Sequence, residues 1–189
     1  MIYLASTSPR RKQLLKEAGI SFRVLRPDYH EKNIRGASPS KLVQVHAFQK
    51  AASASKKIKN GVVIGADTVV FFHGKIIGKP KNKAHAFRVL SLLQGKKHRV
   101  YTGVALLKIS ESRLAAKCVF VQKTAVRLQK MKPAQIARYF KRVNPLDKAG
   151  AYAIQSRHAG IVEKVEGSFS NAVGLPMEVV SRQLEKFVY

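Results

Sequence analysis

The chain of 189 residues is short of cysteine, of acidic side chains and of long apolar runs. Its single cysteine, Cys118, excludes an intramolecular disulfide framework and any zinc site built from several cysteines. Lysine or arginine interrupts every apolar stretch before it reaches the roughly 18–20 residues that a membrane-spanning helix needs. The first residues run apolar and then basic, the reverse of a secretory signal. We therefore expect a soluble, cytoplasmic protein with no membrane partner.

The shortage of acids leaves 36 Lys and Arg against 10 Asp and Glu, a formal net charge of +26. The excess is spread along the whole chain and is not gathered in a tail. Such a surface attracts polyanions by long-range steering and by the release of counterions. Weak, nonspecific nucleic-acid binding is one interpretation, and a lysine-rich surface that only keeps the protein in solution is the other. The sequence carries no RNP pattern, zinc finger or basic zipper that would favour the first.

Apolar periodicity and turn residues predict a single domain over residues 1–189 in which strands and helices intermix. We expect strands over residues 2–5, 21–25, 61–72, 99–109, 117–128, 151–155 and 159–165, with ISESRLAA as the loop between the fourth and the fifth. We expect helices over residues 9–18, 40–57, 82–93, 133–143 and 176–187. Because the order is not a strict βαβ alternation, the predicted fold class is α/β, with a mixed β-sheet flanked by helices.

The segment Ser6-Thr7-Ser8-Pro9-Arg10-Arg11 ends a strand and begins a helix with two arginines in its first turn. Cations at this end of a helix oppose the helix dipole by about 0.3–1 kcal/mol each. An anion in front of the helix would remove the conflict, because backbone N–H groups, serine hydroxyls and guanidinium groups could converge on phosphate oxygens. The alternative is that both arginines simply point into solvent.

Asp67 and Thr68 interrupt the apolar run VVIGADTVVFF, which is predicted to be a buried strand. A buried carboxylate is costly unless it is paired, solvated or bound to a metal ion. Asp67 is therefore either a member of a structural ion pair or a residue of a functional site. Since the chain has only 10 acids, we favour the site.

Later segments carry weaker signals. Pro80 restricts Lys79 toward an extended conformation in a stiff loop after the hairpin, and an ordinary exposed turn lysine is the alternative to a site residue. Residues 147–155 and 166–176 are rich in small side chains, as loops close to ligands often are. Gln155 could read a base edge or could satisfy a turn. The histidines show no metal-ligand spacing, and no GxSxG, Walker or GxGxxG motif is present.

The sequence resembles the Maf family of nucleoside triphosphate pyrophosphatases in segments that follow one another along nearly the whole chain: LASTSPRRKQLL, Glu31 after PDYH, FQKA around Lys50, IGADTVV, GKP, DKAGAYAIQ and EGSFSNAVGLP. The combination of DKAGAYAIQ with GSFSN looks like the subgroup that acts on dTTP and UTP. The resemblance implies an elongated fold related to inosine triphosphatase-like pyrophosphatases, with the substrate in a cleft between two lobes. The chain departs from the family at Phe48-Gln49 and in the YHE sequence that leads to Glu31.

The resemblance also implies roles for individual residues. Asp67 would be the catalytic base, acting alone or through a divalent cation, Mg²⁺ or Mn²⁺, that it shares with Glu31. The phosphate-binding residues would be Ser6, Arg10, Arg11, Lys50 and Lys79, and the base-selecting residues would be Arg11, Thr68 and Gln155. We expect hydrolysis of dTTP, UTP or modified pyrimidine triphosphates to the monophosphate and pyrophosphate, in a house-cleaning role.

Two alternative functions stay open from the sequence. One is a nucleic-acid-associated regulatory protein that uses its basic surface and has lost turnover in its pocket. The other is a pyrophosphatase of the subgroup that favours 7-methyl-GTP. A homodimer is compatible with the sequence, which does not determine the oligomeric state.

Overall fold

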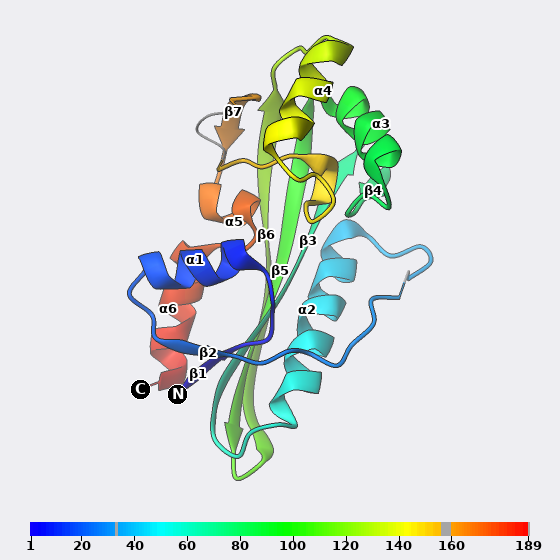
Figure 1. The fold of residues 1–189 in the computed structure, drawn as a ribbon. Coiled ribbons are helices and arrows are strands. Elements are labelled where there is room, and N and C mark those ends of the chain that lie inside the picture. The colour runs from blue at the N-terminus through cyan, green and yellow to red at the C-terminus, as the bar shows by residue number, and fades with distance from the viewer. Residues whose placement is uncertain (33, 156–159, 189) are drawn as a thin grey trace.

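An elongated mixed sheet forms the centre of the molecule, and helices pack on both of its faces (Figure 1). The computed structural model describes residues 1–32, 34–155 and 160–188. The strands are β1 (Ile2–Leu4), β2 (Phe22–Val24), β3 (Gly61–Phe72), β4 (Lys75–Ile77), β5 (Lys97–Ser110), β6 (Arg113–Leu128) and β7 (Val162–Glu166). The helices are α1 (Pro9–Glu17), α2 (Pro39–Ser55), α3 (Lys83–Leu93), α4 (Pro133–Arg142), α5 (Phe169–Val173) and α6 (Met177–Val188), with a 3₁₀ turn at Ala149–Ala151.

The strand order is β2-β1-β3-β5-β6-β7, and the short β4 pairs with the upper end of β3. β1 is parallel to both β2 and β3, and the other pairs are antiparallel. The sheet is therefore mixed, as the sequence predicts. No helix in the described part of the chain has the length and apolar character needed to cross a membrane.

Three predictions about the connections are wrong. ISESRLAA is not a loop, because β5 and β6 continue to a two-residue turn at Glu111 and Ser112, whose φ angles of 49° and 65° match the twist of a tight hairpin. Residues 151–155 form no strand: Ala151, with a φ of 64°, ends a 3₁₀ turn, Tyr152 is extended but is not part of the sheet, and residues 154–155 form a turn. The segment after Ser168, predicted to be a loop, is the short helix α5, which the Ser168 side chain caps.

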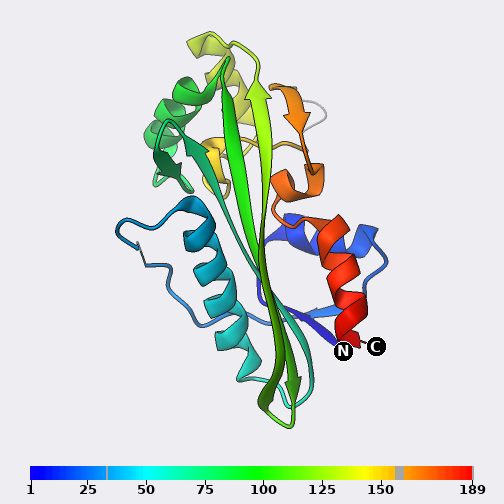
Figure 2. The same ribbon diagram turned by 180° about the vertical axis from the view of Figure 1, so that it is seen from behind.

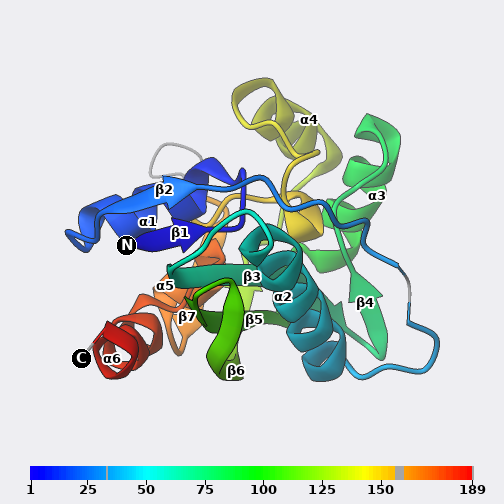
Figure 3. The same cartoon turned by 90° about the horizontal axis from the view of Figure 1, so that it is seen from below.

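The two faces of the sheet pack against different helices. α2 covers one face, where Ala47 and Ala51 lie against Val63 and Leu107. α1 and α6 cover the lower part of the opposite face, and α3 and α4 cover its upper part. Seen from below, α2 and α6 lie on opposite sides of the central strands (Figure 3).

α2 lies unusually close to the sheet because two strand positions beneath it have no side chain. A Cβ atom at Gly65 would lie 2.2 Å from the carbonyl oxygen of Ala47, and one at Gly103 would lie 2.4 Å from the carbonyl of Val43. Glycine inside a strand often marks such a close approach. These contacts set the distance between α2 and β3, and so the position of any side chain that α2 directs toward Asp67.

The apolar core is divided between the two ends of the sheet. The upper cluster joins Val70 and Val100 to α3 and α4, and the lower clusters join the sheet to α1, α2 and α6. In Figure 1 these helix groups are separated along the length of β3 and β5. Polar residues of β3 lie at the level where the two groups meet, and a cavity opens there.

Candidate active site

A cavity of about 350 Å³ opens at the level where the upper and lower helix groups meet. With the exception of Gln155, the site residues predicted from the sequence all line it: Ser6, Arg10, Arg11, Glu31, Lys50, Asp67, Thr68 and Lys79. Pockets of a few hundred Å³ with convergent polar groups are typical of sites for small ligands. The predicted residues come from segments that are distant in sequence, so the fold itself brings them together.

The start of α1 directs a buried arginine into this cavity. Arg11 donates from Nε to the carbonyl oxygen of Gly174 at 2.8 Å, and its terminal nitrogens donate to Ser6 Oγ at 3.2 Å and Thr68 Oγ1 at 3.0 Å. Burial lowers the pKa of Arg11, and the nearby charge of Asp67 opposes that shift. Arg11 therefore does not point into solvent, and the backbone and two hydroxyls hold its guanidinium.

Arg10 reaches the other wall of the cavity, where an acid holds it. Its guanidinium donates to Asp147 Oδ2 and to the Asp147 carbonyl oxygen, both at 2.9 Å. Lys148 donates to Asp147 Oδ1 at 2.6 Å and to the carbonyl oxygen of Asn144 at 2.9 Å. Burial raises the pKa of Asp147, but the hydrogen bonds from Lys148 and Arg10 outweigh it, so the pKa lies below its ordinary value. Asp147 thus stays ionised and positions two cations.

The carboxylate of Asp67 on β3 pairs with Lys50 from α2. Lys50 Nζ lies 2.7 Å from Asp67 Oδ1 and 2.6 Å from Glu31 Oε1. The Asp67 residue is only 6% exposed, whereas the Glu31 side chain is 49% exposed. A carboxylate this buried is stable only with a partner, and Lys50 supplies it.

Glu31 and Asp67 have the chemistry that a divalent cation needs. Both carboxylates contact the ammonium nitrogen of Lys50. The distance between their two contacting oxygens therefore cannot exceed the sum of the two contact distances. Mg²⁺ is typically held by one or two carboxylates together with substrate phosphates. Among the described residues, no group of three or more His, Cys, Asp or Glu could hold a metal by itself. A cation at this pair would therefore draw its remaining ligands from a bound phosphate or from water.

The remaining predicted residues separate into two groups. Lys79, on the connection between β4 and α3, is exposed and lines the same cavity as Asp67. Thr68 Oγ1 lies 3.0 Å from Thr102 Oγ1, which in turn donates to the carbonyl oxygen of Asn171. Gln155 lines a neighbouring hollow with Gln13 instead, although the adjacent Ile154 lines both.

Sequence analysis assigned no individual site role to four polar residues that line the cavity: Tyr29, Asp147, Lys148 and Tyr152. The scarcity of acids, which singled out Asp67, applies equally to Asp147 and could have found it. Tyr29 and Tyr152 carried no such signal. Their contacts, to His46 at 2.8 Å and to His98 at 2.8 Å, depend on the tertiary fold.

The arrangement can bind a polyanion and hold a water molecule beside it. The cavity is lined by five basic side chains against three acidic ones. Guanidinium and ammonium groups fixed in a recess suit phosphate oxygens, and their effect is largest where negative charge develops. A carboxylate among them can accept a proton from water.

Comparison with known proteins finds relatives along nearly the whole chain. The family model for Maf-like proteins matches residues 1–187. A dTTP/UTP pyrophosphatase of Pelotomaculum thermopropionicum is 40% identical over 188 residues, covering 100% of this chain and 97% of that protein. A protein of the same name from Methanosarcina barkeri is 41% identical, with coverage of 98% and 93%. The structure of the Staphylococcus aureus Ham1 protein matches with a TM-score of 0.53 at 16% identity, covering 98% of each chain, and confirms the predicted fold.

Proposed function

The chain belongs to the Maf family, and from that premise we propose that it is a nucleoside triphosphate pyrophosphatase that acts on dTTP and UTP. One observation carries the proposal: a buried carboxylate, Asp67, shares a cavity with Arg10, Arg11, Lys50 and Lys79. In the reaction, a water oxygen bonds to the α-phosphorus and the α–β anhydride bond breaks. The products are the nucleoside monophosphate and pyrophosphate.

The basic side chains would bind the triphosphate and stabilise the leaving pyrophosphate. Arg10 and Lys79 are available from two walls of the cavity, and a phosphate oxygen would take the place of Asp147 as one partner of Arg10. Arg11 and Ser6, which already contact each other, would present a fixed donor pair. Cations held in place before the reaction stabilise developing charge without reorganising.

Asp67 would orient the attacking water and accept its proton. The hydrogen bond from Lys50 uses Oδ1 at 2.7 Å and fixes the carboxylate plane, so that Oδ2 can face the water. Lys50 would also neutralise charge on the transferring phosphoryl group. A positioned general base contributes about 10²–10⁴-fold to a rate.

Glu31 and Asp67 are the residues that would hold Mg²⁺ or Mn²⁺. Such an ion would supply charge neutralisation to the phosphate oxygens when bound. Lys50 contacts both carboxylates, so cation binding would require its ammonium to shift toward the substrate.

Selection of the base rests on Thr68 and Arg11 within the cavity and on Gln155 beside it. A site built to hydrogen-bond a pyrimidine edge penalises a base that leaves those groups unpaired. Modified pyrimidine triphosphates fit the same chemistry, which supports a house-cleaning role.

The test is pyrophosphate release from a panel of nucleoside triphosphates with added Mg²⁺, for the wild type and Asp67→Asn. The substitution preserves shape and removes the base, so we expect kcat to fall by about 100-fold or more. Glu185→Gln, which removes one exposed carboxylate on α6, is the matched control and should keep normal turnover. Near-normal turnover by Asp67→Asn would remove Asp67 from this role. Purine triphosphates that outcompete dTTP and UTP would overturn the base assignment.

A further inference from the structure

None of the helices in the described part of the chain covers the upper part of one sheet face. α2 covers the lower part of this face, and seen from behind, the upper halves of β5 and β6 lie open to solvent (Figure 2). The residues there follow from the strand register, because paired residues point to the same side of a sheet. His98 and Val100 of β5 are buried on the opposite face, so Lys97, Arg99 and Tyr101 point to the open one.

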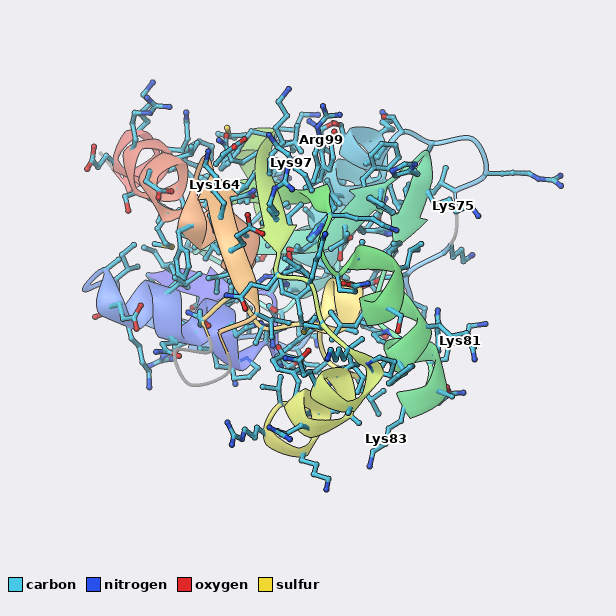
Figure 4. The ribbon with its side chains drawn as sticks, turned by 90° about the horizontal axis from the view of Figure 1, so that it is seen from above. Lys75, Lys81, Lys83, Lys97, Arg99 and Lys164 are labelled. Atoms are coloured by element: carbon cyan, nitrogen blue, oxygen red, sulfur yellow. The ribbon has the colours of Figure 1, made fainter. Side chains whose placement is uncertain are left out.

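The register places the side chains of this open face in three rows. The row at the end of α2 contains Tyr101 and Lys123 beside Val69, which is itself buried against Leu42 and Val43 of α2. The next row contains Ile76, Phe71, Arg99, Ala125 and Glu166, and the outermost contains Lys97, Arg127 and Lys164. Viewed from above, Lys97, Arg99 and Lys164 gather on one side of this end (Figure 4). We call these three rows the open face.

The open face carries positive charges whose placement does not stabilise the sheet. Lys97 lies directly opposite Arg127, and Arg127 lies directly opposite Lys164. Like charges in directly opposed positions destabilise a sheet. Among the described residues of the three rows, Glu166 is the sole acid, and it contacts Lys97 at 2.5 Å and Lys164 at 3.1 Å. Arg99, Lys123 and Arg127 therefore leave a net positive surface that suits a polyanion.

Two aromatic rings lie among these cations. Phe71 and Tyr101 are half-buried and pack edge to face, with ring centroids 6.1 Å apart. Proteins that bind single strands combine a basic surface that follows the phosphates with aromatic rings on which bases stack. A duplex hides its base faces and would gain nothing from the rings. Within residues 1–32, 34–155 and 160–188, this face also presents no helix that could enter a major groove.

From these observations we propose that the open face binds single-stranded nucleic acid, with Arg99, Lys123 and Arg127 on the phosphates and Tyr101 and Phe71 against the bases. The surface is separate from the cavity, because none of these residues lines it. Nucleic-acid binding by the open face can therefore be tested independently of the pyrophosphatase activity.

The test measures fluorescence anisotropy with a labelled single-stranded RNA of about 12 nucleotides, a length within the range that such surfaces cover. Single-stranded DNA of the same sequence, the corresponding duplex and heparin are the comparison ligands. The main variant is the triple substitution Arg99→Gln, Lys123→Gln and Arg127→Gln. The matched control removes the same number of charges from exposed positions at the other end of the same two strands, Lys108→Gln, Arg113→Gln and Lys117→Gln.

We expect the open-face variant to lose about tenfold or more in affinity and the control to change by less than about threefold. The slope of log K against log salt should fall by about 2 in the open-face variant, since each phosphate contact on a single strand contributes about 0.7. Tyr101→Leu should weaken single-strand binding by about fivefold or more and leave duplex binding unchanged. RNA and DNA strands should bind alike if stacking and phosphates carry the affinity.

Equal losses in the two triple variants would overturn the proposal, because the affinity would then reflect net charge alone. Tighter binding of duplex or heparin than of single strands, or no effect of Tyr101→Leu, would also overturn it. Turnover of dTTP and thermal unfolding of each variant report whether the cavity and the fold are intact.

Discussion

One face of the sheet is constructed in two different ways along its length. Beneath α2 it carries glycine and apolar residues, and the helix backbone approaches the strands closely at Gly65 and Gly103. Above α2 the same face carries long basic side chains at Lys97, Arg99 and Arg127, and none of the described helices covers it. The lower part fixes the helix that places Lys50 beside Asp67, and the upper part carries the surface that we propose for nucleic acid.

The cavity and the open face also differ in how their charged side chains are arranged. In the cavity, each acid is paired with cations: Asp67 with Lys50, and Asp147 with Arg10 and Lys148. On the open face, cations face one another across neighbouring strands. Paired charge orients groups for chemistry, whereas unpaired charge of one sign attracts a ligand from solution. The difference predicts which substitutions affect turnover and which affect binding.

Among the substitutions that test this difference between the lower and upper parts of the face, Gly65→Ala should have the largest effect. The new Cβ would lie 2.2 Å from the Ala47 carbonyl oxygen and 2.8 Å from Ala51, so α2 must move away from β3. Overpacking of this kind costs about 3 kcal/mol, which for a chain of this size lowers Tm by roughly 6–12 °C. Because Lys50 moves with α2, turnover of dTTP should fall as well. Thermal unfolding and steady-state kinetics measure the two effects.

Gly78→Ala is the matched control for stability. A Cβ at Gly78 meets nothing within 4 Å and its φ is not positive, so its Tm should stay near that of the wild type. If Gly65→Ala were as stable and active as the wild type, close packing of α2 would not be what positions Lys50.

The sequence reveals the lower region better than the upper one. Gly65 and Asp67 stand out because a glycine and an acid interrupt an apolar strand, and Pro9 marks the start of α1. These are local signals, and the structure agrees with the strand and helix that they predict. The contact between Arg10 and Asp147 joins residues 137 positions apart, and no local pattern encodes it.

The open face was not predicted, because it depends on register. Lys97, Arg127 and Lys164 are ordinary lysines and arginines in sequence, and become a row only when three strands align. The hairpin between β5 and β6 was misread for a related reason: Glu111 and Ser112 adopt positive φ without glycine, so the turn has no composition signal. Long-range pairing decides both features.

A smaller effect is expected from His98, which lies on β5 between Lys97 and Arg99 but points to the buried face. It is 2% exposed and bonds to the Tyr152 hydroxyl, and burial lowers its pKa to about 4. Its pKa in the unfolded chain is about 6.5, so the unfolded state binds more protons between pH 6.5 and 4. Stability is therefore full above pH 6.5 and falls as the pH drops, by about 2 kcal/mol at pH 5.

Thermal unfolding between pH 7.5 and 5 measures this contribution. In His98→Gln the Tm should depend less on pH than in the wild type, even if the variant is less stable throughout. His30→Gln, at an exposed position, is the control and should retain the wild-type pH dependence. An unchanged pH dependence in His98→Gln would show that another group titrates in this range.

The smallest effect should come from Glu166→Gln, which sharpens the comparison by removing the acid of the open face. Glu166 is exposed, and its hydrogen bonds from Lys97 and Lys164 hold its pKa below the ordinary value. Exposed ion pairs contribute little to stability, so Tm should change less than it does through His98. Affinity for single-stranded RNA at low salt should rise, by about twofold to fivefold, because a repelling charge within one Debye length of the phosphates is gone.

Glu111→Gln, at the far hairpin, removes the same charge outside that range and should leave affinity unchanged. Equal increases in the two variants would mean that the RNA responds to net charge and not to this face.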